Sequence, residues 1–299
     1  MVSTRAAAIL FAIVILTLLP VVTHAQGPPI NTDTPIMLGV EGRGVRTFLK
    51  VVTMDKLFVS GAETADPMNR SMTAFIYPVV VPFNLTPKTQ IGAIAPFLTR
   101  NFKSTAGDNS QSGFGDASIF LKHLVLQVDR KAETLRVAIK GSAKFPTGND
   151  SCSPALGSGS VDYGISVVAG WIKSRWGLYG ETIYNINTSN GATDFGNRFA
   201  GNAAVGYRVL PTHYTHYPQP QLNLYLEMNG SVVERTRIDG MENPDSGGSI
   251  VLFSPGLQYV GGRRWLIEAS VQLPVINEPN GTQLGTSWAA SLGTRVLIF

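Results

Sequence analysis

Apolar and polar side chains alternate with a period of two along most of the chain after residue 44. Around Trp265, every second residue from Trp265 to Val275 is apolar, and Glu268 and Gln272 lie among the intervening positions. Because successive side chains of a β-strand point to opposite faces, this pattern predicts strands with one apolar and one polar face. No comparable stretch shows the 3.6-residue spacing of an amphipathic helix. The pattern therefore predicts an all-β fold.

The composition is unusual for a soluble β-protein. Charged residues make up 15% of the 299 residues, which is below the roughly 25% of soluble globular domains. The net charge of only +4 argues against a nucleic-acid-binding protein. The single cysteine, Cys152, excludes an intramolecular disulfide framework and a multi-cysteine zinc site.

The first 25 residues have the features of a secretory signal peptide. Arg5 precedes the apolar run 6–22, and a Thr-His-Ala sequence leads to Gln26 as the expected new N-terminus. An uncleaved membrane anchor is the alternative, but the run is short and no basic cluster follows it. We expect an exported chain in which residues 1–25 are removed and residues 26–44 form a short segment on the periplasmic side or in a pore mouth.

Twelve strands are predicted in the remainder of the chain. This even number is expected for bacterial barrels in which both ends of the chain lie on the periplasmic side. Their expected ranges are 45–54, 70–81, 88–102, 115–127, 131–145, 159–172, 176–188, 198–210, 220–234, 249–260, 263–276 and 286–299.

The predicted connections alternate in length. Those after the even-numbered strands are mostly short: 82–87, 128–130, 173–175, 211–219 and 261–262. Those after the odd-numbered strands are longer and polar: 55–69, 103–114, 146–158, 189–197, 235–248 and 277–285. Short periplasmic turns and longer extracellular loops are typical of outer-membrane barrels. We therefore predict a transmembrane antiparallel β-barrel of about 12 strands over residues 45–299, in the cell outer membrane of a Gram-negative bacterium; a soluble exported β-protein is the alternative.

Three glycine-rich motifs occur in an order that resembles a known family. They are residues 113–116 (GFGD), 144–148 (KFPTG) and 157–164 (GSGSVDYG). Together they resemble the outer-membrane proteins named after the meta-cleavage pathway of phenol degradation, over about residues 45–299. The resemblance implies an outer-membrane barrel that transports hydrophobic or aromatic compounds, and it supplies no catalytic or binding residues.

The same motifs have a structural interpretation. The two Gly-x-Gly elements, 113–116 and 157–164, each lie where a long loop enters a strand. Glycine tolerates the positive φ angles and bulges found at barrel rims. Two aspartates in these motifs would accept hydrogen bonds from loop amides, so we favour a rim-building role over ligand contact. The rim residues are Gly113, Gly115, Asp116, Gly157, Gly159 and Asp162.

Charged residues on the less apolar phase of each strand are expected to face the lumen, because a charge on the lipid face at mid-membrane costs about 2–4 kcal/mol. These residues are Arg46, Lys50, Arg100, Lys122, Arg136, Lys140, Lys144, Asp162, Glu181, Arg208, Glu227, Glu268 and Arg295. They would form either a narrow, basic-leaning pore or a network of salt bridges that fills the barrel.

No catalytic constellation is evident. His213 and His216 form a pair without a third metal ligand, and His123 has no apparent partner. We therefore expect no enzyme activity, no metal and no cofactor. The expected function is passive transport of small, hydrophobic or aromatic molecules; the alternative is a non-transporting structural or surface-interaction barrel with a filled interior.

The expected partners are outer-membrane lipid, a small-molecule substrate and the barrel-assembly machinery, and no nucleic acid is expected. The chain ends on Phe299, and a terminal aromatic residue on the last strand resembles the signal that the assembly machinery reads. Phe299 lies in the opposite phase to the apolar positions of that strand, such as Trp288 and Leu292.

Overall fold

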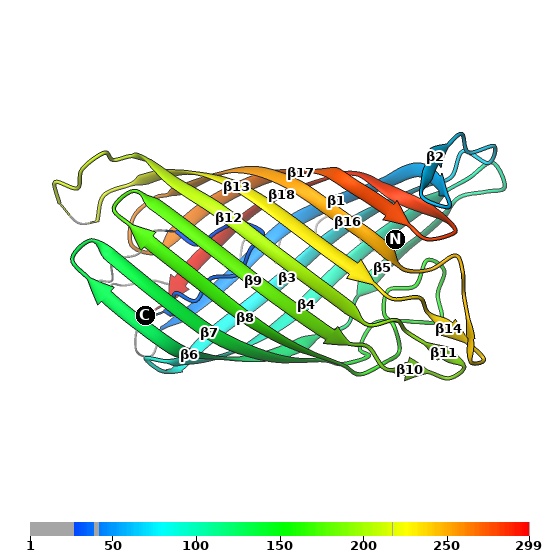
Figure 1. Ribbon diagram of the computed structural model, residues 1–299, viewed down its shortest axis with the longest axis horizontal. Helices are drawn as coiled ribbons and strands as arrows, with labels where there is room; N and C mark the ends of the chain where they lie inside the picture. The colour runs from blue at the N-terminus through cyan, green and yellow to red at the C-terminus, as the bar shows by residue number, and fades with distance from the viewer. Residues whose placement is uncertain (1–26, 39–41, 217, 299) are drawn as a thin grey trace.

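The computed structural model describes residues 27–38, 42–216 and 218–298. Within these ranges, twelve strands form a closed antiparallel barrel, which confirms the predicted fold class and strand number (Figure 1). The predicted signal peptide and Phe299 lie outside the described residues.

Among the residues that the structure describes, no helix is long and apolar enough to cross a membrane.

The barrel strands follow one another around the wall in chain order, and the last strand returns to the first. Arg43 lies opposite Ile298, and Val59 lies opposite Thr282. This closure gives every barrel strand two hydrogen-bonded neighbours. The strands are β1 (Arg43–Val59), β3 (Ser71–Thr86), β4 (Thr89–Lys103), β6 (Ser118–Arg130), β7 (Glu133–Lys144), β8 (Asp162–Lys173), β9 (Trp176–Ile186), β12 (Arg198–Leu210), β13 (Gln221–Val233), β16 (Gly248–Val260), β17 (Trp265–Pro279) and β18 (Thr282–Ile298).

The two ends of the barrel differ as the sequence predicts. One end carries tight turns, including residues 87–88, 131–132 and 174–175. The other end carries the longer loops, which contain further short strands (Figure 1). These are β2 (Ala62–Thr64), β5 (Asn109–Phe114) and a four-stranded sheet of β10 (Ser189–Asn190), β11 (Thr193–Asp194), β14 (Arg237–Ile238) and β15 (Met241–Glu242).

Two connections are several residues shorter in the structure than the sequence predicts, which leaves turns of only two residues. β3 extends to Thr86, so most of the expected turn at 82–87 is strand. The expected long loop at 277–285 is wrong, because β17 and β18 continue through it and leave only residues 280–281 between them. Gly281 has a φ of 55°, a left-handed conformation that glycine adopts without steric cost and that a two-residue turn can use.

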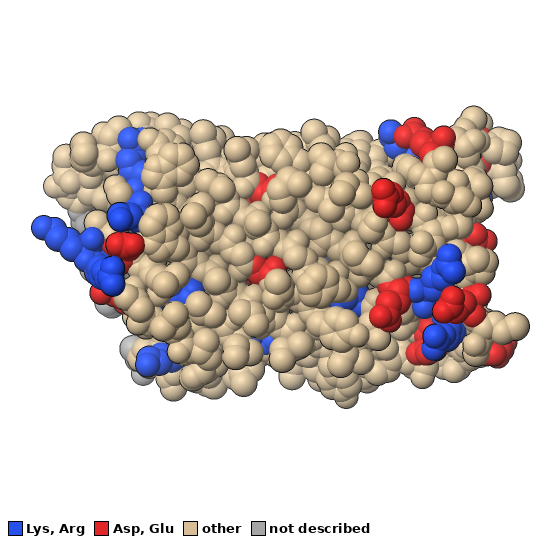
Figure 2. Space-filling view, in the orientation of Figure 1, with Lys and Arg blue, Asp and Glu red and all other residues tan. Residues whose placement is uncertain are grey.

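The alternation of side chains separates lipid from lumen. On β13, Leu224, Leu226 and Met228 are 47%, 55% and 41% exposed on the outer face. The intervening Tyr225 and Glu227 are 1% and 0% exposed. Figure 2 shows the result on one face of the molecule: Lys, Arg, Asp and Glu gather mainly at the two ends, and a broad band between them carries little charge.

Aromatic side chains gather near the tight turns. The rings of Trp176 and Tyr207 lie 4.5 Å apart, and those of Tyr259 and Trp265 lie 5.8 Å apart. Trp176 and Trp265 are each the first residue of a strand at this end. Such girdles place rings with one apolar and one polar edge at the level of the lipid headgroups.

The lipid-facing role of β13 is tested by replacing Leu226 with lysine. We expect Leu226→Lys to lower the free energy of unfolding by about 2–4 kcal/mol, because the charge would enter the hydrocarbon. Met241→Lys is the control, since Met241 is 73% exposed on a loop strand, and it should have little effect. The measurement is urea-dependent unfolding in lipid vesicles; equal losses for both variants would contradict the assignment.

Candidate functional site

Residues 27–38 lie inside the barrel, where they contact the inner faces of several strands (Figure 1). We call them the lumenal segment. Its position depends on its composition: Pro28, Pro29 and Pro35 have no N–H to donate to a sheet ladder, so the segment is poorly suited to become a strand. Its carbonyl and remaining N–H groups are free to bind side chains of the wall.

Asp33 ties the segment to one side of the barrel. Its Oδ1 lies 2.7 Å from the Lys122 Nζ on β6, and its Oδ2 lies 2.7 Å from the Lys140 Nζ on β7. Lys140 also pairs with Glu181 of β9 at 3.0 Å. Lysines and carboxylates can remain charged inside a barrel when they are paired in this way.

Glu227 of β13 binds the same segment from another part of the wall. The backbone N–H groups of Ile30, Asn31 and Thr32 donate to its two carboxylate oxygens over 2.7–3.1 Å. Glu227 is fully buried, and these donors replace the water that a buried carboxylate loses. A run of three consecutive N–H groups around one carboxylate fixes the path of the backbone.

Two arginines bind the carbonyl oxygens of the segment. Arg46 donates to Ile30 O, and Arg295 donates to Pro29 O at 2.6 Å. Both guanidinium groups also pair with Glu268 at 2.9 Å. Gln258 donates to Pro28 O at 2.8 Å. The prolines therefore present carbonyl acceptors to a set of donors that the barrel supplies.

Apolar packing completes the anchor. Ile30 belongs to a buried cluster with Tyr179, Ala204 and Tyr225, and the Tyr225 hydroxyl donates to Gly27 O. A Cβ added at Gly256 would lie 2.4 Å from the Ile30 Cδ1. A larger residue at this position would push Ile30 away from the wall.

A cavity of about 400 Å³ remains beside the lumenal segment. Ile30 and Asn31 of the segment form part of its lining. The rest comes from the inner faces of the strands and includes Arg46, Phe48, Lys50, Arg198, Asn202, Asn229, Ser231, Ile250, Leu252, Glu268 and Gln272. We call this space the lumenal cavity.

A second polar cluster lies at the end with the long loops. Asp116 accepts hydrogen bonds from the backbone N–H groups of Gly148 at 3.0 Å and Ser158 at 2.9 Å. The Lys144 Nζ lies 3.3 Å from Asp116 and also pairs with Asp162. A Cβ on Gly157 would lie 2.5 Å from the Asp116 Oδ1. This cluster ties the loop 145–161 to the rim.

The other residues of the rim motifs lie near this cluster. Gly159 has a φ of 71°. Asp162 accepts a hydrogen bond from the Thr188 N–H at 2.9 Å, so it also tethers the following loop. A Cβ on Gly113 would lie 3.0 Å from a Leu156 methyl group, and one on Gly115 would lie 2.8 Å from a Leu98 methyl group.

Three of the cations expected in the lumen have local partners away from the lumenal segment. Arg100 donates to Ala155 O in the rim loop. Arg136 pairs with Asp129 at 3.2 Å, near the tight turns. Arg208 donates to Pro211 O at 3.1 Å, also at that end. Across the described residues, no group of three or more His, Cys, Asp or Glu side chains is placed to hold a metal ion.

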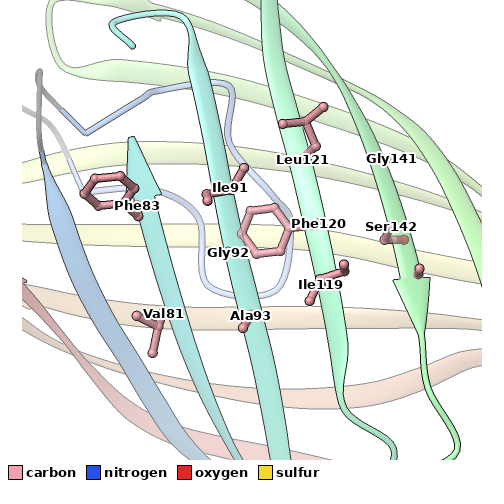
Figure 3. A pocket seen from close by; sticks show the side chains of 11 residues that line it. Val81, Phe83, Ile91, Gly92, Ala93, Ile119, Phe120, Leu121, Gly141 and Ser142 are labelled. Carbon is pink, nitrogen blue, oxygen red and sulfur yellow. The ribbon is translucent and has the colours of Figure 1, made fainter. Parts of the chain in front are cut away.

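The outer wall has an apolar hollow of its own, of about 560 Å³. Figure 3 shows its lining on neighbouring strands β3, β4, β6 and β7. Val81, Ile91, Ile119 and Leu121 are 38–52% exposed there, on the phase that faces lipid. Gly141 leaves space between these larger side chains. The hollow is suited to contact acyl chains.

Two components of the site are not among the residues that the sequence pattern predicts to face the lumen. Asp33 lies in a segment without strand periodicity, so no phase assigned it to the lumen. Arg198 begins a strand and was not included among the inward residues. The prolines around Asp33 were the available signal, since they predict a segment that does not join the sheet.

The anchoring role of Asp33 is tested by Asp33→Asn. The variant removes the carboxylate shared by Lys122 and Lys140, and removing one partner of a buried ion pair costs about 3–5 kcal/mol. We expect hydrogen exchange of the Ile30, Asn31 and Thr32 amides to accelerate at least about tenfold. Glu63→Gln is the control, because Glu63 pairs with Lys56 at the surface; unchanged exchange in Asp33→Asn would contradict the role.

The rim cluster predicts a pH dependence. Burial raises the pKa of Asp116, but hydrogen bonds from Ser158 and Gly148 and the Lys144 charge outweigh it, so the pKa is lowered from 3.8. The stabilisation is therefore complete above pH 3.8 and is lost as the pH falls through the lowered value.

We expect Asp116→Asn to speed proteinase K cleavage within loop 145–161 about tenfold at neutral pH, because it loses charge-assisted hydrogen bonds. In the wild type, pepsin cleavage of this loop should accelerate only below pH 3.8. Asp239→Asn, in a different loop, is the control. Resistance of Asp116→Asn equal to that of the wild type would refute this explanation.

Comparison with known proteins identifies related sequences and folds. A family model described as "Putative MetA-pathway of phenol degradation" matches residues 71–290. The COG4313 outer membrane channel from Pseudomonas putida F1 is 13% identical, with a TM-score of 0.71 over 90% of this chain and 99% of that chain. At this identity the likeness shows the fold alone, an outer-membrane β-barrel, in agreement with the predicted location.

Two other solved structures are more distant. The beta domain of the Bordetella autotransporter BrkA has a TM-score of 0.49 and 10% identity, over 85% of this chain and 98% of that chain. A Pseudomonas aeruginosa FadL homologue has a TM-score of 0.38 and 10% identity, over 86% and 89%. No curated protein matches the chain in sequence.

Proposed function

Because the chain belongs to the family described as "Putative MetA-pathway of phenol degradation", we propose that it is a passive outer-membrane channel for small, hydrophobic or aromatic molecules. The observation that carries this proposal is the lumenal cavity, a space of about 400 Å³ inside a closed barrel. Phe48, Ile250 and Leu252 give this cavity an apolar wall. Apolar surface inside an otherwise polar lumen is suited to molecules with an apolar body.

The lumenal segment limits what can pass. It is bound to β6 and β7 through Asp33 and to β13 through Glu227. A segment held from both sides narrows the barrel without a large domain, so only small molecules would pass. Downhill diffusion needs no energy-coupling group, and a lumen of suitable width and lining is sufficient.

The transport route is tested by filling the lumenal cavity. Ser231 lines the cavity, whereas the next residue, Val232, is 55% exposed on the lipid face. We expect Ser231→Trp to reduce uptake of radiolabelled toluene severalfold in cells that express this channel in place of their own hydrocarbon channels. Val232→Trp, the matched control, should leave uptake unchanged because tryptophan is accommodated in lipid.

The alternative is a barrel with a filled interior and no transport function. The dense contacts of the lumenal segment favour this alternative, since they occupy much of the lumen. It predicts toluene uptake no higher than in cells without the barrel and no measurable ion conductance in planar bilayers. That pair of results would replace the channel by a structural or surface-interaction role.

A further inference from the structure

The cations of the lumenal cavity outnumber its carboxylates. Arg46, Lys50 and Arg198 line the cavity, and Glu268 is the carboxylate among the lining residues. Glu268 is already bound by two guanidinium groups, those of Arg46 and Arg295, each at 2.9 Å. It therefore has little capacity to neutralise further charge in the cavity.

Lys50 and Arg198 are left without counter-ions. In the described part of the chain, neither side chain forms an ion pair or a hydrogen bond. The neighbouring cations Arg198 and Arg46 repel Lys50 electrostatically. Glu181 attracts Arg198 electrostatically. However, Glu181 is occupied by Lys140 at 3.0 Å and by the Asn202 amide at 3.1 Å.

Unpaired cations inside a barrel are costly unless something binds them, because confinement removes part of their hydration. An anion with oxygen acceptors would bind both groups. The planar guanidinium of Arg198 suits a carboxylate in particular, since it can donate two parallel hydrogen bonds to it.

The lining and volume of the cavity also limit the size and chemical character of the rest of such an anion. Phe48, Ile250 and Leu252 offer an aromatic ring and two branched aliphatic side chains. A volume of about 400 Å³ lies in the range of sites that take small organic molecules, roughly 300–1,000 Å³. The lining thus combines a cationic face with an apolar one.

We propose that the lumenal cavity is a binding site for small carboxylates with an aromatic or aliphatic body, held by Lys50 and Arg198. This inference rests on the proposed function, because it names a substrate class for the same lumen. The carboxylate group binds the two cations, and the apolar body of the molecule packs on Phe48 and its neighbours. The binding is weak enough for the anion to be released and to continue through the barrel.

Binding is tested with the full-length mature protein in detergent micelles. Benzoate and benzyl alcohol are the probes, since they share a ring and differ in charge, and isothermal titration calorimetry measures their affinities. We expect benzoate to bind at least about tenfold more tightly than benzyl alcohol, because charge-assisted hydrogen bonds form only with the carboxylate.

The two cations are tested by a double variant, Lys50→Gln with Arg198→Gln. We expect it to weaken benzoate binding at least about tenfold and to leave benzyl alcohol binding unchanged. Lys173→Gln is the matched control, because the Lys173 side chain is exposed near a tight turn. A difference in gel mobility between unheated and heated samples verifies that each variant is a folded barrel.

Two results would overturn the proposal: equal affinities of the wild type for both probes, or benzoate affinity unchanged in the folded double variant. Toluene uptake by cells separates this site from the channel itself. Uptake without preferential benzoate binding would remove the anion site and keep the channel. Benzoate binding without uptake would keep the site and remove the transport function.

Discussion

Hydrocarbon offers no hydrogen bonds to a peptide group, and the pairing of β1 with β18 is the contact by which this chain meets that constraint. Without it, two strands would present rows of unpaired N–H and C=O groups to lipid. Once the sheet is closed, each strand has one face toward acyl chains and one toward the lumen. The apolar outer band and the charged interior of this protein both follow from that closure.

Closure also encloses polar side chains on the inner faces of the strands, and the lumenal segment supplies partners for several of them. The inner faces carry the buried groups Lys122 and Glu227 and the partly buried Arg295, and each needs a partner where water is restricted. Asp33 supplies charge to the lysine, three backbone N–H groups bind Glu227, and proline carbonyls accept from the wall. The segment and the wall therefore satisfy each other, whereas the cations of the lumenal cavity are satisfied less completely.

Sequence periodicity predicted much of this structure. It predicts the twelve strands of the barrel, and it assigns Glu227 and Lys122, which are both buried, to the inner face. It failed at residues 277–285, where polar residues looked like a loop although they continue two paired strands. Polarity is a weak guide there, because strands that extend beyond the membrane no longer need an apolar face. Asp33 was missed because a proline-rich segment has no phase to read.

The sequence by itself determined that the chain forms strands, which face of each strand is apolar, and which end of the barrel carries the long loops, because these properties depend on residues near one another in the chain. Only the tertiary structure decided that Glu227 binds the N–H of Ile30, a residue 197 positions away. It also decided which lumenal cations are paired. Such partners are selected by the closed shape of the barrel, and residues so distant in sequence leave no local pattern that could predict their contact.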